Sequence, residues 1–429
     1  MPQIEKIKFL RIKIIVMQAG KVKKYVILGH SAAAISAVEA IRSHDPNGEI
    51  TIVAAEKGLA YSPVLLTYYI SNRLDRKGLF FTYKGFYQRN RINLLEGISA
   101  IGIDPEKQLV ELSDKNKISY DRLLIATGSS ARKLRFCDPD LPGLFTLKTI
   151  ADADGILAHS SSKKDILILG GGLIGLQSAN ALAGANHKVT IVIGSSQVMS
   201  QNIDYQCSSI LSKALPERKF KVLYNTSVTQ LESFSDKLQA TLNDGSTLSV
   251  DMVIAGKGVI PNTQMTKGSG IKTDWGIIVN QAMQSNYPNV YAAGDVAEGE
   301  DFISKEQAVV ATWPNACLQG KTAGLNMSGK DIHFSSLNGN VTGIFGKAIA
   351  SVGFSGKLQE GYSETKFLNP LTSVYRKLVF NEVDEIVGAV FLDAISDIGV
   401  VRNMINNRIQ VPEHRRERLV RGPIRFYIP

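Results

Sequence analysis

Short apolar runs alternate with longer segments of mixed polarity along most of the chain. This alternation predicts strands joined by helices, as in a parallel α/β fold. The first strand is predicted at Lys24–Gly29, the next helix at Ala32–Ser43, and two further strands at Ile50–Glu56 and Arg122–Thr127. Each strand is apolar almost throughout, so we expect it to be buried on both faces of its sheet.

The order of strand, glycine-rich loop, helix and strand recurs in the middle of the chain. Strands are predicted at Asp165–Leu169 and Val189–Ile193, and the helix between them is predicted to end near Ala183. Later apolar runs predict strands at Met252–Ala255 and Asn289–Ala292. An internal repeat of this kind predicts two similar domains, each built around a parallel sheet.

Beyond residue 331 the pattern changes. Strands predicted at Leu378–Phe380 and Val387–Leu392 flank the polar sequence NEVDE, which indicates a hairpin, and a helix is predicted near Ile395–Asn407. The predicted fold class is α/β, with two Rossmann-like three-layer domains followed by a small α+β domain. The predicted divisions are a basic N-terminal extension at 1–22, a first domain at 23–130 and 270–330, a second domain at 131–269, and a C-terminal α+β interface domain at 331–429.

The net charge of +10 is concentrated at the two ends of the 429-residue chain. Residues 1–24 carry seven Lys or Arg against one acidic residue, and residues 401–429 carry seven Arg against two Glu. Such ends are either solvated tails or a docking surface for an acidic protein partner. Nucleic acid is disfavoured as a ligand, because no aromatic residues are interleaved with the basic ones.

The remaining composition predicts a cytoplasmic protein without a membrane span. No apolar run approaches the roughly 20 residues that a spanning helix needs, and the first residues lack the features of a signal peptide. Whether residues 1–16 belong to the folded protein stays open. The three cysteines, Cys137, Cys207 and Cys317, form no CxxC pair. This spacing excludes a sequence-local redox disulfide or zinc knuckle and favours a reducing compartment.

The first candidate site is the sequence ILGHSAAAISAVEAIR, which resembles a dinucleotide-binding loop. Gly29, Ser31 and Ala34 occupy its three small-residue positions, and a pyrophosphate would lie at the helix start near Ala32. Glu56 ends the next strand, where a carboxylate can accept hydrogen bonds from both ribose hydroxyls. Alone the motif is weak, because any βαβ unit can contain a tight turn.

Two more strand ends add to this candidate site. One strand ends with Ala126 and Thr127 and is followed by Gly128. The other is followed closely by Gly294 and Asp295, whose carboxylate could reach the hydroxyls of a polyol. Between these strand ends lies a second and intact loop, GGGLIG, at residues 170–175. The second nucleotide site is predicted at this loop and its neighbours, which comprise Gly170, Gly172, Ile174, Gly175, Ile193 and Gly258.

The order of these segments resembles the pyridine nucleotide–disulfide oxidoreductase superfamily of flavoproteins, from about Lys23 to the C-terminus and including Trp313–Gly329. The nearest branch is similar to NADH:rubredoxin reductases and to the flavin domains of nitrite reductases. The resemblance implies FAD at the first site, with Asp295 on the ribityl chain and Trp313 near the pyrimidine edge of the flavin. It also implies NAD(H) or NADP(H) at the second site. The residues it implies around FAD are Gly29, Ser31, Ala32, Ala34, Glu56, Ser62, Pro63, Ala126, Thr127, Gly128, Gly294, Asp295 and Trp313.

Several positions depart from the family pattern. Val64 stands where thiol-reducing members carry a redox cysteine, which disfavours disulfide and persulfide chemistry. Pro63 takes the place of a lysine, and Ser62 and Pro63 either contact the flavin or shape a turn. Ile193 replaces the carboxylate expected at the adenosine ribose, and Gln177 and Ile260 replace charged residues near the nicotinamide. The preference for NADH or NADPH is therefore not predicted.

We therefore predict an FAD-dependent oxidoreductase that transfers electrons between a nicotinamide cofactor and an acidic electron-transfer protein or an iron–sulfur partner subunit. No catalytic side chain and no metal site is predicted, because the flavin carries the chemistry. The alternative is an FAD-bearing structural or regulatory subunit with a vestigial nicotinamide site. An oligomer through the C-terminal domain is compatible with the sequence. The identity of the acceptor or donor, the direction of electron flow and the oligomeric state are left open.

Overall fold

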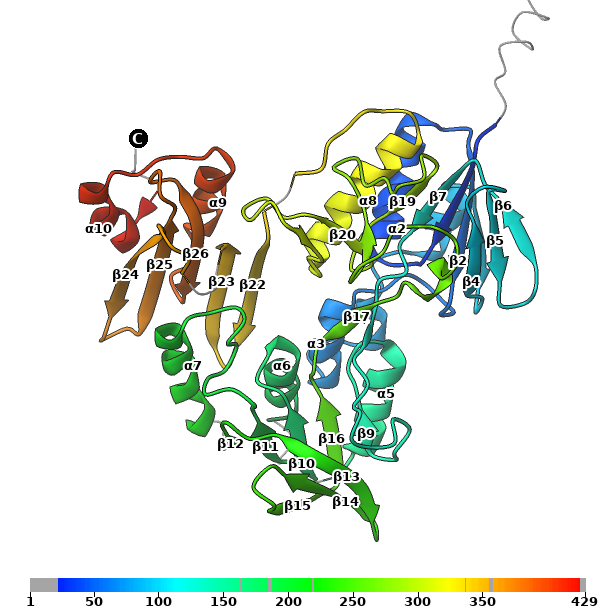
Figure 1. Ribbon diagram of the computed structural model, residues 1–429. Coiled ribbons are helices and arrows are strands. Elements are labelled where there is room, and N and C mark those ends of the chain that lie inside the picture. The colour runs from blue at the N-terminus through cyan, green and yellow to red at the C-terminus, as the bar shows by residue number, and fades with distance from the viewer. Residues whose placement is uncertain are drawn as a thin grey trace, which may run out of the picture.

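The computed structural model describes residues 22–162, 164–183, 187–217, 220–335, 337–354 and 358–424. Apart from Val22, the predicted basic N-terminal extension lies outside these residues, as does Arg425. The described chain forms two parallel-sheet domains and a C-terminal domain with an antiparallel sheet, which confirms the predicted fold class (Figure 1).

The first domain is built on a five-stranded parallel sheet. In sheet order its strands are β19 (Val290–Ala292), β7 (Arg122–Ile125), β1 (Lys24–Leu28), β2 (Glu49–Ala54) and β3 (Ile92–Glu96). The central strand β1 is apolar except at its first residue, and Tyr25 to Leu28 are buried. Burying each large apolar side chain contributes roughly 1.5–3 kcal/mol, so the sequence can form this strand only inside a sheet.

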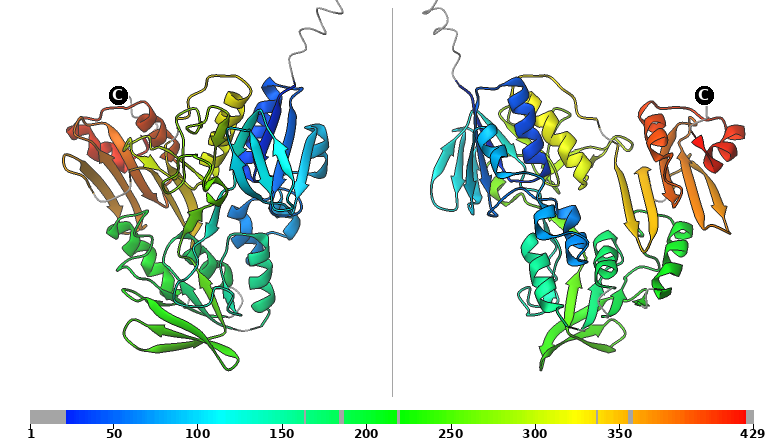
Figure 2. Two further views of the ribbon diagram at one scale, coloured as in Figure 1. Left: turned by 45° about the vertical axis from the view of Figure 1, so that its right-hand side comes forward. Right: turned by 180° about the vertical axis from the view of Figure 1, so that it is seen from behind.

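Two helices pack side by side in this domain, α2 (Ala32–His44) and α8 (Trp313–Met327), which lie far apart in the sequence (Figures 1 and 2). Their close approach depends on two glycines of α8. A Cβ atom on Gly320 would lie 2.1 Å from the carbonyl oxygen of Ala33, and one on Gly324 would lie 2.5 Å from that of Ala37. This packing places the middle of α8, at Gly320, beside the start of α2.

Smaller elements complete the first domain. The antiparallel strands β4–β6 share its core, and β18, β20 and β21 form another small sheet. Their bounds, with those of the short helices, are β4 (Ala100–Asp104), β5 (Leu109–Leu112), β6 (Lys117–Ser119), β18 (Ile277–Ile278), β20 (Ala297–Glu300), β21 (Gln307–Ala308), η1 (Pro63–Leu65), α3 (Leu66–Ile70), η2 (Arg76–Leu79), α4 (Lys84–Arg89) and η4 (Gln264–Thr266).

The second domain repeats the plan with a sheet in the order β12-β11-β10-β16-β9, all parallel. The predicted strand Asp165–Leu169 is β10, and Met252–Ala255 is β16. The other elements are β12 (Lys221–Leu223), β11 (Lys188–Val192), β9 (Leu144–Phe145), α5 (Ile150–His159), α6 (Leu173–Leu182), α7 (Tyr205–Glu217), and the antiparallel strands β13 (Val228–Phe234), β14 (Lys237–Leu242) and β15 (Thr247–Val250).

The chain passes between the two domains through a two-stranded ribbon of β8 (Ser129–Ala131) and β17 (Val259–Pro261). A second link comes from the segment after β2. There, Leu66 and Ile70 of α3 are buried in the same hydrophobic core as Ile150 and Ala153 of α5. The segment after β2 is therefore packed against the second domain.

The C-terminal domain contains a five-stranded antiparallel sheet in the order β22-β23-β26-β25-β24. The predicted hairpin is confirmed as β25 and β26, although β25 begins four residues earlier than predicted, at Val374. The hydrophobic pattern missed this extension because Arg376 and Lys377 are polar yet buried. The elements are β22 (Gly339–Ile344), β23 (Lys347–Gly353), β24 (Ser363–Asn369), β25 (Val374–Phe380), β26 (Ile386–Leu392), α9 (Ile398–Asn406) and α10 (Glu413–Arg421).

The arginine-rich helix α10 is only partly the exposed surface that its sequence predicts. Arg416 is buried, and its guanidinium pairs with Asp384, donates to the Ser363 hydroxyl and lies over the ring of Phe380. Burial of this charge is possible because these groups satisfy it. The predicted docking surface must therefore exclude Arg416.

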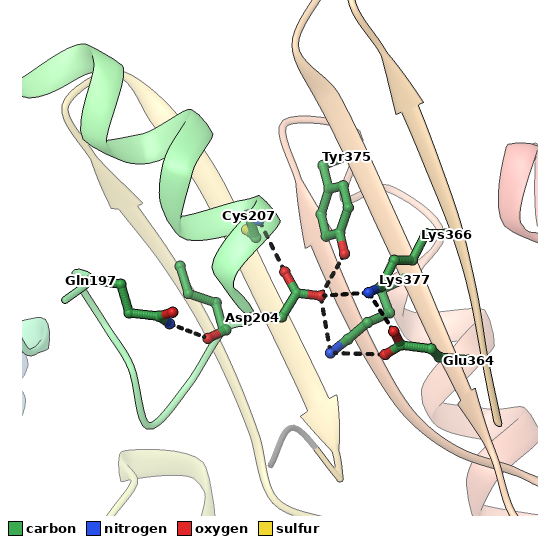
Figure 3. A network of polar contacts seen from close by, with 8 residues as sticks. Gln197, Asp204, Cys207, Glu364, Lys366, Tyr375 and Lys377 are labelled. Carbon is green, nitrogen blue, oxygen red and sulfur yellow. Dashed lines mark hydrogen bonds and ion pairs between the residues drawn. The ribbon is translucent and has the colours of Figure 1, made fainter. Parts of the chain in front are cut away.

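A polar network joins the C-terminal domain to the second domain (Figure 3). The Asp204 carboxylate, just before α7, accepts a hydrogen bond of 2.5 Å from the Tyr375 hydroxyl and lies 3.1 Å from the Lys377 ammonium. Lys366 and Glu364 of β24 extend the network. Burial opposes ionisation of Asp204, but these donors and the Cys207 N–H lower its pKa below the ordinary value.

Across the described ranges, the helices are too short or too polar to span a bilayer. The longest of them, α8, has 15 residues, fewer than the roughly 20 that a membrane span requires.

Candidate dinucleotide-binding site

One cavity of about 2190 Å³ extends between the three domains. A pocket for one drug-sized ligand usually has roughly 300–1,000 Å³, so this cavity has room for more than one. Both glycine loops open into it. The predicted residues that line it are Gly29, Ser31, Ala32, Glu56, Ser62, Pro63, Ala126, Thr127, Gly128, Gly294, Asp295 and Trp313 of the first set, and Gly170, Gly172, Ile174, Ile193 and Gly258 of the second.

Two predicted residues lie behind the cavity wall. Ala34 is fully buried inside α2. Gly175 packs so closely that a Cβ atom there would lie 2.1 Å from the carbonyl oxygen of Gly170. Neither residue is among the described residues that line the cavity, so their place in the two binding sites stays a prediction. They let each helix start approach its strand, which is what the third small position of the motif requires.

The first cradle is the turn from β1 into α2. Gly29 has a φ of +115°, and a Cβ atom there would lie 2.0 Å from the carbonyl oxygen of Ala126. Only glycine fits this turn. Ser31 is the N-cap residue of α2, and the helix begins with small alanines. The N–H groups of the first helical turn have no partner inside the helix and carry a partial positive charge, so they can bind a pyrophosphate.

His30 also lies in this turn, and its ring is partly buried against Tyr87. Its Nε2 is 2.7 Å from the hydroxyl of Tyr87, which also accepts a hydrogen bond from the N–H of Ala60. Burial lowers the pKa of His30 to about 4, and the charge of Glu96 opposes this only weakly. His30 is therefore a neutral side chain that fixes the outer wall of the cradle.

Asp295 is held at the cavity wall by two donors. Its Oδ2 accepts a hydrogen bond of 2.6 Å from the Ser129 hydroxyl and lies 3.1 Å from the ammonium of Lys148. The preceding Gly294 has a φ of +82° and donates its N–H to the Gln319 side chain of α8. The carboxylate is thus positioned before any ligand binds.

Lys148 was not predicted from the sequence. It stands just before α5, whose N-cap Thr149 and Asp152 form a capping box. A lysine before a helix start has no distinguishing pattern, and its partner Asp295 is 147 positions away in the chain. Only the fold brings the two charges together at the cavity.

The two chain segments that pass between the first and second domains are hydrogen-bonded to each other beside the first cradle. The Thr127 hydroxyl donates to the carbonyl oxygen of Asn262 at 2.8 Å, and the Asn262 amide donates to that of Thr127 at 2.9 Å. Gly128 and Gly258 take positive φ values of +65° and +84° within these crossings. These two hydrogen bonds hold the Thr127 side of the cavity against the Asn262 side.

The loop after β2 forms another wall. The exposed Glu56 carboxylate accepts a hydrogen bond of 2.9 Å from the Tyr61 hydroxyl. Ser62 is buried and Pro63 begins a short helix, so both shape the turn. Val64 has 55% of its surface exposed and lines the cavity where a redox cysteine would be expected by resemblance. Trp313 closes this side, and its ring packs edge-on to that of Phe81.

The second cradle has the same turn geometry as the first. Gly170 has a φ of +120°, and a Cβ atom there would lie 2.4 Å from the carbonyl oxygen of Gly256. Gly172 is the N-cap residue of α6, and a Cβ atom there would meet nothing within 4 Å. Ile193, at the end of β11, is only 2% exposed and packs against Gly171. The phosphate cradle is therefore intact, whereas the ribose position has no charged acceptor.

The C-terminal domain also lines the cavity, which the sequence did not predict. The Gln177 amide of α6 donates a hydrogen bond of 2.7 Å to the Thr342 hydroxyl of β22. Asn340 and Arg402 line the cavity from the same domain. Gln177, identified from the sequence only as a departure from the family pattern, thus joins the second cradle to the C-terminal sheet.

No cysteine is present among the described residues that line the cavity. Cys207 is buried, and burial raises its thiol pKa to about 12. Burial also raises the pKa of Cys137 and of Cys317, so neither tends to form a thiolate. Within the described ranges, no group of His, Cys, Asp and Glu side chains could hold a metal ion.

These residues fit FAD at the first cradle. The turn at Gly29 lets the protein backbone approach a pyrophosphate closely, and the Asp295 carboxylate can accept hydrogen bonds from hydroxyls of the ligand. They fit the pyrophosphate of a second dinucleotide at Gly170–Gly172. FAD, when bound, supplies exchange of electron pairs with a nicotinamide and of single electrons with a carrier. The protein supplies the two cradles, the fixed carboxylate and the shared cavity.

Comparison with known proteins agrees with this geometry. The family model of the pyridine nucleotide-disulphide oxidoreductases matches residues 23–320. The epsilon subunit of the NADH-dependent phenylglyoxylate dehydrogenase of Aromatoleum evansii is 31% identical over 410 residues, which cover 94% of this chain and 95% of that protein.

Two solved structures share the fold. The ferredoxin reductase of the CYP199A2 system from Rhodopseudomonas palustris has a TM-score of 0.85 at 23% identity, over 92% of this chain and 97% of that one. Putidaredoxin reductase in its covalent complex with putidaredoxin has a TM-score of 0.85 at 23% identity, over 94% of this chain and 99% of the other.

Proposed function

The chain belongs to the pyridine nucleotide-disulphide oxidoreductase family, and on that premise we propose that it transfers electrons between NAD(P)H and a protein electron carrier through bound FAD. The observation that carries this proposal is one cavity that joins both cradles and has no thiol among its described lining residues. With no cysteine beside the flavin site, electrons leave through the flavin itself.

The acceptor we propose is an iron–sulfur protein or an iron–sulfur subunit of a larger complex. The names of the relatives support this choice: one is a subunit of an NADH-dependent dehydrogenase, one is a ferredoxin reductase, and one is a reductase bound to putidaredoxin. The matches cover most of this chain and most of each of those proteins. The carrier or subunit would receive electrons singly, without a covalent step on the protein.

A second candidate is favoured by Ile193. An apolar and buried residue stands where the adenosine ribose would need an acceptor, and Ile260 lies in the ribbon next to Ser130. On this alternative the second domain is a scaffold, and the chain is an FAD-bearing structural or regulatory subunit of a redox complex that does not itself turn over nicotinamide.

The test is anaerobic mixing of the purified flavoprotein with NADH and with NADPH, followed by ferricyanide as an artificial acceptor. The proposal requires bleaching of the flavin by at least one nucleotide and continued turnover in the Cys137→Ser, Cys207→Ser, Cys317→Ser triple variant. No bleaching at millimolar nucleotide would favour the scaffold. Loss of turnover on changing Cys317 alone would show that the flavin is not the only redox centre.

A further inference from the structure

A lysine that the sequence did not single out stands beside the second cradle. Lys257 follows β16 and the closely packed Gly256, and its side chain lines the cavity. A Cβ atom on Gly256 would lie 3.0 Å from the N atom of Gly175 and 3.4 Å from the carbonyl oxygen of Leu169. The backbone that carries Lys257 is therefore fixed against the phosphate-binding turn.

The charge of Lys257 has no partner within the described part of the chain. Its ammonium makes no hydrogen bond or ion pair there, and burial is the sole cause that lowers its pKa below that of an ordinary lysine. Lys148, beside the first cradle, differs because its ammonium pairs with Asp295. A half-buried cation without a counter-ion is costly, and an anionic ligand in the cavity would stabilise it.

The sheet order indicates which part of a dinucleotide Lys257 would meet. β10 lies between β11 and β16. In this fold the residue at the end of the second strand, here Ile193 after β11, marks the adenosine ribose. Lys257 stands on the other side of the pyrophosphate turn, after β16. It therefore faces the half of the dinucleotide that carries the nicotinamide.

We propose that Lys257 is a positioning residue that binds the nicotinamide-side phosphate of NAD(P)H and supplies affinity that is missing at the ribose position of Ile193. This inference rests on the proposed function, because it requires a nicotinamide nucleotide in the second cradle. It explains how that cradle can bind a dinucleotide without the usual carboxylate. It also implies weak discrimination between NADH and NADPH, since Lys257 is remote from the 2′ position.

The test compares a whole ligand with a fragment on the FAD-loaded protein. ADP-ribose contains both phosphates, whereas AMP contains only the adenosine half. In Lys257→Met we expect the dissociation constants of ADP-ribose and NAD⁺, neither of which can reduce the flavin, to rise roughly tenfold to a hundredfold when measured by calorimetry, as expected for loss of a charge-assisted contact. The dissociation constant of AMP and the FAD content should stay within about twofold of the wild-type values, a smaller change than the loss of one hydrogen bond would cause.

Two further variants complete the design. Lys213→Met removes an exposed lysine of α7 in the same domain and should leave all three dissociation constants unchanged. Lys257→Arg keeps the positive charge and should restore most of the ADP-ribose affinity. Equal weakening of AMP and ADP-ribose would indicate a general defect of the domain and overturn the inference. Loss of FAD from Lys257→Met would assign the lysine to the flavin site instead.

The outcome separates this inference from the proposed function. If NADH reduces the wild-type flavin and Lys257→Met binds ADP-ribose normally, only the inference fails. If the wild-type protein binds neither NADH nor ADP-ribose, the proposed function fails first.

Discussion

At the residue scale, Asp295 is the side chain on which flavin binding should depend most. Replacing it by Ala removes the acceptor for a ligand and leaves Lys148 and the Ser129 hydroxyl without their partner. An unpaired group in a part-buried site costs roughly 1–3 kcal/mol, so FAD affinity should fall by about tenfold to a hundredfold. The measurement is FAD titration of the apoprotein. Asp274→Ala, an exposed acid of the same domain, is the matched control. Unchanged affinity in Asp295→Ala would remove this residue from the site.

The buried side chain of His30 should make the free energy of unfolding depend on pH. Its pKa falls from 6.5 to about 4 in the folded protein because of burial, so between these pH values the unfolded chain binds more protons than the native one. The contribution of His30 to the free energy of unfolding is therefore fully present above the pKa of the unfolded state, 6.5. It is lost as the pH falls toward the pKa in the folded protein, about 4. The loss should reach up to about 3 kcal/mol.

The measurement for His30 is urea unfolding of the apoprotein at several pH values, because a bound pyrophosphate would itself favour the protonated imidazole. His30→Gln cannot titrate, so its stability should change less between about pH 7 and about pH 4.5 than that of the wild type. Parallel pH profiles for the two proteins would mean that His30 is not held neutral.

The site residues that could be predicted from the sequence share one property: their role follows from their position relative to a neighbouring strand or turn. Gly29 and Gly170 belong to turns of fixed length, and Asp295 directly follows a glycine just beyond a strand end. Lys148 and Lys257 could not be located in this way. Each gains its significance only from what the fold brings near it, which is Asp295 for Lys148 and the shared cavity for Lys257.

At the element scale, the two glycines Gly170 and Gly172 in the turn from β10 into α6 should have different roles, the first in stability and the second in nucleotide binding. Gly170 has a positive φ, and an added Cβ would collide with the Gly256 carbonyl, so Gly170→Ala should lower the free energy of unfolding by more than about 2 kcal/mol. Gly172 has a φ of −81°, and its added Cβ would meet open space in the cavity wall. Gly172→Ala should therefore keep its stability within about 0.5 kcal/mol and weaken NADH binding.

The pair is measured by chemical unfolding and by nucleotide titration on the same preparations. Each variant is the control for the other, because both add one methyl group to one loop. If Gly172→Ala binds NADH as tightly as the wild type, the second cradle does not hold a nucleotide.

Helix α10 supports a narrower docking prediction than its sequence did. Arg415 and Arg418 are exposed, whereas Arg416 is buried against Asp384 and Arg421 pairs with Glu417. For an acidic carrier, Arg415→Glu with Arg418→Glu should slow electron transfer and leave ferricyanide reduction unchanged. Electrostatic steering should also make the wild-type rate fall between about 10 mM and about 150 mM salt, as the screening length shrinks from roughly 30 Å to roughly 8 Å.

The control for this prediction is Lys115→Glu with Lys221→Glu, which makes the same charge change at exposed sites in the other two domains. A salt-independent rate, or equal slowing by both double variants, would argue against a docking role for α10.

Among the elements, the buried strands of the parallel sheets were predicted closely, because their runs of apolar residues cannot form anything exposed. The C-terminal sheet was predicted only as a hairpin. Its strand β25 contains Lys377, which is buried because Asp204 and Glu364 satisfy its charge. A pattern of hydrophobic positions cannot reveal a polar residue whose partner belongs to another element.

At the scale of the whole molecule, function depends on how three domains enclose one cavity. The Thr127–Asn262 exchange holds the first domain to the second, and the Asp204–Lys377 network holds the second to the C-terminal domain. Gln177 and Thr342 add a contact at the cavity itself. The two cradles are thus kept in one enclosure, as electron transfer between two bound dinucleotides requires.

The most direct test of the central claim is an anaerobic reductive titration of the wild-type holoprotein with NADH, and with NADPH if NADH is inactive. The account predicts that the flavin absorbance is lost completely after about one equivalent of nucleotide per FAD, because the flavin is the only redox centre and takes up one electron pair. An end point at about two equivalents would reveal a second centre, such as a disulfide, and no bleaching by either nucleotide would contradict the proposed transfer of electrons from NAD(P)H.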